Sequence, residues 1–144
     1  MDVKNYMAKI SGPLLDRIDL QIELPSLTFE ELSVAKPGES SAAIRARVVA
    51  ARKFATDRMA AAGETRFHCN AMLDSAAIRK FCVMNEGATK LLSAAFDTLG
   101  LSARGYDRLL RVARTIADLA ASEIITEAHI AEAIQFRKLD KKYF

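Results

Sequence analysis

The chain has 144 residues, of which 51% are hydrophobic and 27% are charged, with a formal net charge of +3. This length fits one domain with a hydrophobic core, and the charge tolerates an anionic partner without requiring one. No apolar run approaches the roughly 20 residues of a membrane span, and no signal-peptide core is present, so we expect a cytoplasmic protein without a membrane segment.

Residues 18–24 are predicted to form a half-buried strand. Apolar and polar side chains alternate there, and Pro25 ends the pattern. Ser11 and Pro13 predict a short turn of helix before it. A lone strand leaves its N–H and C=O groups unpaired, so we expect its partner strands to lie outside this chain, which would make it a C-terminal fragment. A hairpin with residues 27–34 is the alternative.

Most of the remaining chain is predicted to be helical. Residues 25–39 are expected to form a connector between the strand and the first helix, with a short extended piece near Leu27 and Phe29. The apolar periods and the capping residues then predict five helices: 41–62, 74–84, 85–99, one from Ser102 to about Ala120, and one from Thr126 to Phe136. The fold class is therefore mostly α, a bundle of four to five helices with a short N-terminal strand.

Cys69 and Cys82 are the two cysteines, and they lack CxxC spacing. We expect reduced, half-buried thiols that contribute to packing. His68 lies beside Cys69, but His129 is distant, so we expect no metal site.

Arg17 stands at the predicted turn into the strand, between Asp16 and Asp19. A guanidinium fixed at such a junction can reach across an interface with little entropy to lose. The simpler interpretation, from composition alone, is a local ion pair with the neighbouring carboxylates.

Arg104 is predicted to lie in the first turn of the helix after Ser102. Anions bind favourably at helix N-termini, and an arginine there adds a bidentate charge suited to phosphate. Gly105 inside a helix is costly, which indicates a close approach of another group. Arg108 and Arg111 would share the face of Arg104. A solvated basic face is the equally good alternative.

The motifs that cradle a nucleoside triphosphate are absent from this sequence. It contains neither GxGxxG nor the P-loop pattern GxxxxGKS/T, and no apolar strand ends in an acidic pair. We therefore expect that this chain alone cannot hold ATP with Mg²⁺.

Three segments resemble one family in sequence and in order. Residues 6–20 (YMAKISGPLLDRIDL) are similar to the segment that closes the AAA+ core of magnesium-chelatase-like ATPases of the ComM/YifB type. Residues 101–119 (LSARGYDRLLRVARTIADL) resemble the second-sensor helix of that family, and residues 130–137 (IAEAIQFR) its last helix.

The resemblance implies a specific organisation and two functional residues. Residues 1–25 would be a remnant of the AAA+ core, 26–40 a linker, 41–137 the helical lid and 138–144 a basic tail. Arg17 matches the arginine finger of the family, the catalytic residue that reaches the nucleotide of the adjacent subunit. Arg104 matches the second-sensor arginine, which contacts the γ-phosphate bound in its own subunit.

The resemblance also implies a function for the full-length protein. It would be a homo-oligomeric ring ATPase, expected to be a hexamer, that uses ATP with Mg²⁺ and processes DNA in competence. The fragment alone would be inactive. The alternatives are a helical nucleic-acid module, with phosphate contacts from Arg45, Arg52, Lys53, Arg108 and Arg111, and a protein-interaction module with no nucleotide role.

Overall fold

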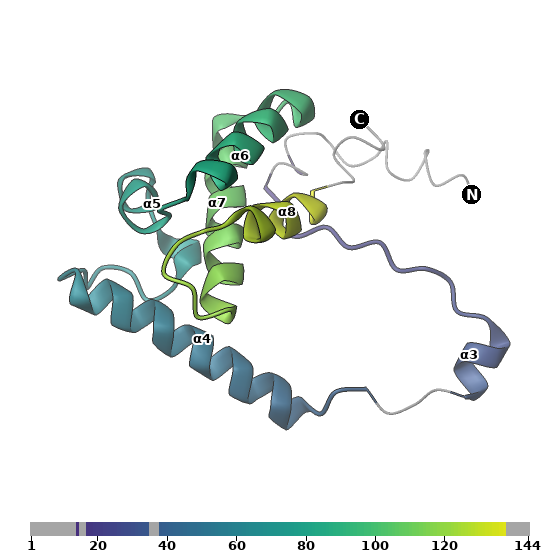
Figure 1. Ribbon diagram of the computed structural model, residues 1–144. Helices are drawn as coiled ribbons and strands as arrows, with labels where there is room; N and C mark the ends of the chain where they lie inside the picture. The colour runs from purple at the N-terminus through teal and green to yellow at the C-terminus, as the bar shows by residue number, and fades with distance from the viewer. Residues whose placement is uncertain (1–13, 15–16, 35–37, 138–144) are drawn as a thin grey trace.

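The computed structural model describes residues 14, 17–34 and 38–137. It confirms the mostly helical fold class (Figure 1). The described elements are α3 (Phe29–Ser33), α4 (Ser41–Ala61), the 3₁₀ turn η1 (Asn70–Met72), α5 (Ser75–Phe81), α6 (Glu86–Leu99), α7 (Ala103–Leu119) and α8 (Glu127–Gln135). The predicted turn at Ser11–Pro13 and the predicted basic tail lie outside the described residues.

Helix α7 is the centre of the bundle. It packs against α4, α5, η1 and α8, and α6 packs on α8 (Figure 1). The apolar stripe predicted from its sequence is buried, with Leu109 and Ala113 at most 1% exposed. The largest fully buried apolar side chains around it come from other parts of the bundle, namely Met59, Leu73, Leu92, Ile125 and Ile130. Burial of each such large side chain contributes about 1.5–3 kcal/mol, so α7 is fixed mainly by apolar packing.

The helices begin where the capping residues predict. Ser40, Asp74 and Ser102 each accept a hydrogen bond from the backbone N–H three residues later, at 3.2, 2.8 and 3.0 Å. Asn85 caps α6 in the same way. Each cap satisfies a backbone donor that the helix itself leaves free. At the other end of α6, Gly100 adopts φ 59°, a left-handed conformation that favours glycine.

The predicted helix 74–84 is wrong at its end, because α5 stops at Phe81. The next residues leave the helix and pair with the segment before α8. The carbonyl of Val83 accepts from the N–H of Ile125 at 2.8 Å, and the N–H of Asn85 donates to the carbonyl of Ile125 at 3.1 Å. This long-range pairing outweighs the local helical pattern.

The predicted strand at 18–24 is not formed in this chain. No strand is assigned to the described residues, and Leu20, Ile22 and Leu24 are 50%, 65% and 84% exposed. The physical reason is the lack of a partner strand in the described part of the chain: without a second strand beside it, an extended segment can neither complete a ladder of hydrogen bonds nor bury its apolar face. The extended piece predicted near Leu27 and Phe29 is also wrong at Phe29, which is the first residue of α3.

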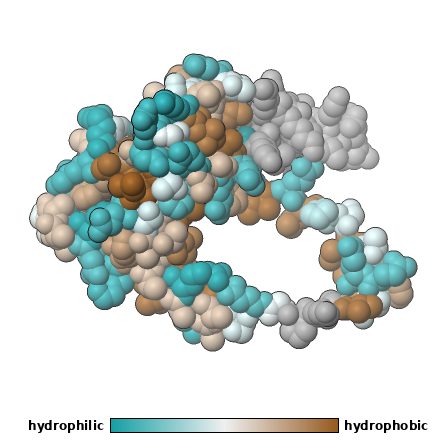
Figure 2. All heavy atoms as spheres, in the orientation of Figure 1, coloured by the Kyte–Doolittle hydropathy of each residue, from teal (hydrophilic) through white to brown (hydrophobic). Residues whose placement is uncertain are grey.

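Helix α3 is a single capped turn outside the core. The hydroxyl of Thr28 accepts from the N–H of Glu31, and the Glu31 carboxylate accepts from the N–H of Thr28 at 2.8 Å. This capping box explains why the segment turns helical. Its apolar side chains stay exposed, with Phe29 at 80%, and Figure 2 shows hydrophobic atoms on this segment, away from the bundle.

A buried polar cluster joins α4, η1 and α7. The Asp118 carboxylate accepts from Asn70 Nδ2 at 2.7 Å, from Arg58 Nη2 at 3.1 Å and from Arg114 Nε at 3.1 Å. Arg114 is fully buried, and its remaining donors bond the carbonyls of Ser122 and Glu123. Burial lowers the pKa of Arg114, and the adjacent Asp118 opposes that effect. The cluster fixes the C-terminal half of α7.

The two thiols differ in environment, which predicts selective alkylation. Cys82 is 5% exposed, and burial raises its pKa to about 11, whereas Cys69 is exposed. Because the thiolate is the nucleophile, we expect iodoacetamide at pH 8 to alkylate Cys69 and to react with Cys82 at least about 100-fold more slowly. Mass spectrometry should show one adduct on the native chain and two in urea. Equal rates for both thiols in the native chain would contradict the assigned burial.

None of the helices in the described part of the chain combines the length and the apolar character needed to cross a bilayer.

Candidate functional site

The N-terminus of α7 is the centre of the candidate site. Ser102 accepts from the N–H of Gly105 at 3.0 Å, which fixes the first turn of the helix. Gly105 is buried, whereas Arg104 is exposed. The helix dipole and the free N–H groups of this turn favour an anion beside it. The sequence prediction that Arg104 lies in the first turn is correct; whether it contacts phosphate stays a prediction.

The four arginines of α7 have different roles. Arg111 Nη2 donates to the carbonyl of Leu73 at 2.7 Å, and Arg114 belongs to the buried cluster. Arg108 Nη1 donates to the carbonyl of Arg17 and to a carboxylate oxygen of Asp19, each at 2.5 Å. Within the described part of the chain, the Arg104 guanidinium forms no hydrogen bond or ion pair. Arg111 and Arg114 therefore bond groups within the bundle and Arg108 bonds the segment at residues 17–19, whereas Arg104 has no such partner among the described residues.

Arg17 is exposed, and its side chain has no ion pair among the described residues. The expected local pair with Asp19 is not formed, because Arg108 binds that carboxylate. Asp16, the other expected partner, lies outside the described residues. The backbone of Arg17 is held on both sides: its N–H donates to the carbonyl of Leu14 at 3.0 Å, and its carbonyl accepts from Arg108.

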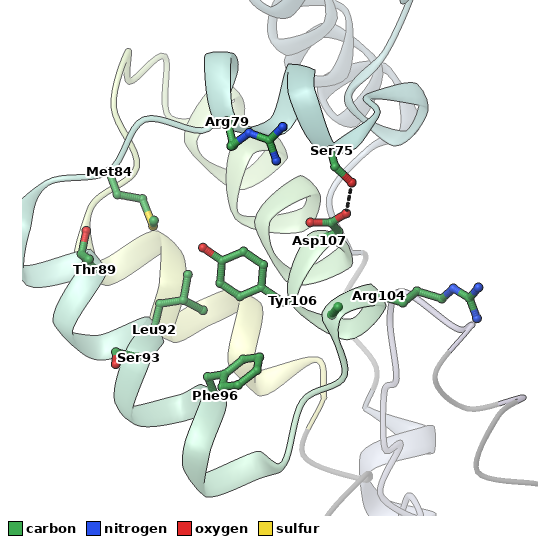
Figure 3. A pocket seen from close by; sticks show the side chains of 11 residues that line it. Ser75, Arg79, Met84, Thr89, Leu92, Ser93, Phe96, Arg104, Tyr106 and Asp107 are labelled. Carbon is green, nitrogen blue, oxygen red and sulfur yellow. Dashed lines mark hydrogen bonds between the residues drawn. The ribbon is translucent and has the colours of Figure 1, made fainter.

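A pocket of about 640 Å³ lies between α5, α6 and α7. Phe96 and Tyr106 form part of its apolar lining, with ring centroids 6.0 Å apart in an edge-to-face arrangement (Figure 3). Ser75 donates to the Asp107 carboxylate at 2.7 Å at its rim. Arg79 and Arg104 also line the pocket, but Figure 3 shows the Arg104 guanidinium extending away from the two rings. Sequence reasoning missed Arg79 and the pocket, because the pocket needs three helices to assemble.

The five basic residues of the alternative nucleic-acid surface do not form one free set. Arg45 and Arg52 are exposed on α4, and Lys53 pairs with Asp57 at 2.6 Å. Arg108 and Arg111 are half-buried and donate to carbonyl and carboxylate oxygens of this chain. A phosphate at Arg108 or Arg111 would have to displace these internal acceptors, which counts against the nucleic-acid interpretation.

Comparison with known proteins defines the class. The family model for the C-terminal part of magnesium chelatase, subunit ChlI, matches residues 38–137, and the model for magnesium chelatase, subunit ChlI, matches residues 1–32. The chain therefore belongs to the magnesium chelatase ChlI family, and the resemblance of the three sequence segments is confirmed.

Within this family the chain is similar to proteins of the ComM/YifB type. It is 43% identical over 137 residues to the uncharacterized protein YifB of Escherichia coli and 39% identical over 138 residues to the competence protein ComM of Haemophilus influenzae. An uncharacterized protein of Mycobacterium tuberculosis is 38% identical over 135 residues. These alignments cover 94–95% of this chain and 26% of each relative, so the chain spans about a quarter of their length.

Proposed function

We propose that this chain is the lid module, with the end of the core, of a ring-forming AAA+ ATPase. Residues 1–25 would complete the core, 26–40 would link, 41–137 would form the lid and 138–144 the tail. The remaining core would supply the P-loop and hold ATP with Mg²⁺. The printed name of one relative, the competence protein ComM, supports a role in competence. From the family resemblance we propose that the full-length protein processes DNA in the cytoplasm and assembles as a homo-oligomeric ring, a hexamer.

The availability of Arg104 is the observation that carries the proposal. Among the arginines of α7, Arg104 is the one that has no partner among the described residues. It lies at the capped N-terminus of this helix of 17 residues. Negative charge accumulates on the transferred phosphoryl group, and a fixed guanidinium stabilises that charge. Bound ATP would supply the phosphate, and Arg104 would sense it from the same subunit. Closure of the lid would bring this helix terminus to the nucleotide.

Arg17 would act on the nucleotide of the neighbouring subunit. Its exposure and its fixed backbone suit a side chain that crosses an interface, because little backbone entropy is lost on contact.

Replacing Arg104 tests the assignment in the full-length protein. We expect Arg104→Ala to lower ATP turnover about 10- to 100-fold, because a charge-assisted hydrogen bond to phosphate is lost, in the range of 1.5–3 kcal/mol. Arg52→Ala, an exposed arginine on α4, is the matched control and should keep normal turnover. Steady-state hydrolysis and binding of a fluorescent ATP analogue give the readouts. Unchanged turnover and affinity in Arg104→Ala would exclude the sensing role.

A further inference from the structure

Residues 17–21 lie against the ends of α7 and α8. The N–H of Gln21 donates to the carbonyl of Phe136 at 2.9 Å, and Arg137 Nη1 reaches the carbonyl of Ile18 at 3.4 Å. Of the described residues between 17 and 34, Gln21 alone is buried. The segment therefore has a defined position on the bundle, although it is separated in sequence from its partners by more than 80 residues.

Arg108 is the contact that lies nearest to Arg17. A single nitrogen, Nη1, bonds both the Arg17 carbonyl and an Asp19 carboxylate oxygen. The Arg108 side chain is 20% exposed, whereas Asp19 is 53% exposed. Arg108 thus holds the backbone of Arg17, whose guanidinium has no hydrogen bond or ion pair with the described residues, as expected of a residue that orients another side chain.

The position of Arg108 on α7 links its contact with Arg17 to Arg104. It follows Arg104 by four residues, so the two side chains share one face of the helix, about 6 Å apart along the axis. A movement of α7 that repositions Arg104 must carry Arg108, and with it the backbone of Arg17. Loss of Arg104 from this face would leave the Arg108 contact unchanged.

We propose that Arg108 is a positioning residue that couples the sensing helix to the trans-acting arginine. This inference rests on the proposed function and adds a physical link between its two sites. When α7 shifts in response to nucleotide in its own subunit, the Arg108 contact carries the shift to Arg17 and to the site next door. Phe136 and Arg137 add contacts to Gln21 and Ile18, so the segment is tied to the bundle at more than one point.

Only Asp19 of this ion pair is largely exposed, and a pair at the surface adds little to the stability of a fold, so loss of the Arg108 contact should act mainly on the position of Arg17. In the full-length protein we expect Arg108→Ala to lower kcat about tenfold or more and to leave KM for ATP within twofold. Arg108→Lys keeps one charged donor and should recover part of kcat. Asp19→Asn should cause a smaller loss, because the carbonyl contact remains. Arg45→Ala, exposed on α4, serves as the control.

Hydrogen exchange gives a readout that is independent of activity. We expect Arg108→Ala to speed exchange at the amides of Arg17 and Gln21 at least about tenfold, while amides within α7 stay protected and show that the bundle is folded. In an Arg17→Ala background, Arg108→Ala should cause no further loss of kcat, because Arg108 acts through Arg17.

The outcomes separate this inference from the proposed function. Full turnover in Arg108→Ala, beside a strong loss in Arg17→Ala, overturns the coupling and leaves the trans role of Arg17 intact. Reduced turnover with unchanged exchange at residues 17–21 overturns it as well, as does a further loss of kcat in the double variant. Normal turnover in Arg17→Ala overturns the proposed function itself.

Discussion

Replacing Arg17 with alanine in the full-length protein will leave ATP binding intact and lower hydrolysis by roughly 10³- to 10⁵-fold, the range found for arginine fingers. In the proposed function Arg17 would meet the nucleotide of a neighbouring subunit and stabilise charge on the phosphoryl group during transfer, whereas other residues would hold the ground-state ATP. Binding is measured with a fluorescent ATP analogue, and turnover by phosphate release.

Two variants sharpen this expectation. Arg17→Lys retains the charge but loses the planar fork, so a partial recovery of turnover is expected. Arg45→Ala, exposed on α4, should behave like the unaltered protein. Turnover of Arg17→Ala that equals that of the unaltered protein would exclude a catalytic role for this residue. Loss of ATP binding in the same variant would also contradict the assignment.

Removing the carboxylate of Asp118 will lower the free energy of unfolding of the 144-residue chain by about 3–5 kcal/mol, as expected when one partner of a buried ion pair is lost. Asp118→Ala leaves Arg114, which is fully buried, without its carboxylate, and it also deprives Arg58 and Asn70 of their shared acceptor. Since small domains are stable by about 5–15 kcal/mol, this change removes a large part of the total. Urea unfolding followed by circular dichroism measures it.

The matched control is Asp57→Ala on α4. Asp57 pairs with Lys53 at 2.6 Å four residues away, and both side chains are more than 60% exposed, so we expect a change of about 0.5 kcal/mol or less. A loss below about 1 kcal/mol for Asp118→Ala would show that the buried cluster contributes less than its geometry indicates.

The helices were predictable because their signals are local. The stripe through Leu109 and Ala113 and the caps at Ser102 and Asp74 depend on residues within one or two turns, and all of them appear in the structure. The Thr28–Glu31 capping box is equally local, and it explains α3, which lies where the sequence prediction had a connector with a short extended piece.

The prediction of a strand at residues 18–24 was wrong for this chain because strand pairing is not a local property. The alternation at residues 18–24 describes a segment that fits a sheet, but a strand forms only where a second one lies beside it. The end of α5 was misplaced for a related reason, since Val83 and Asn85 pair with Ile125, forty residues later in the chain. The alternation or the apolar period of a segment indicates which secondary structure it can adopt, and contacts with distant residues decide whether it adopts that structure.

The candidate site likewise has features that follow from the local sequence and features that depend on distant contacts. The position of Arg104 in a first helical turn followed from the sequence, because capping and periodicity are local. That Arg104 has no partner in the described part of the chain did not follow from the sequence, since it depends on where Arg108, Arg111 and Arg114 find their acceptors. The Arg108 contact with Arg17 spans 91 residues, and no spacing rule within either segment indicates it.

The most direct test of the account mixes two inactive variants of the full-length protein. One carries Arg17→Ala and an intact ATP site, and the other keeps Arg17 but has a disabled ATP site. If Arg17 acts on the neighbouring subunit, mixed rings will hydrolyse ATP, because intact sites then receive an arginine from the adjacent subunit. Co-assembled rings that stay inactive at every mixing ratio would contradict the account.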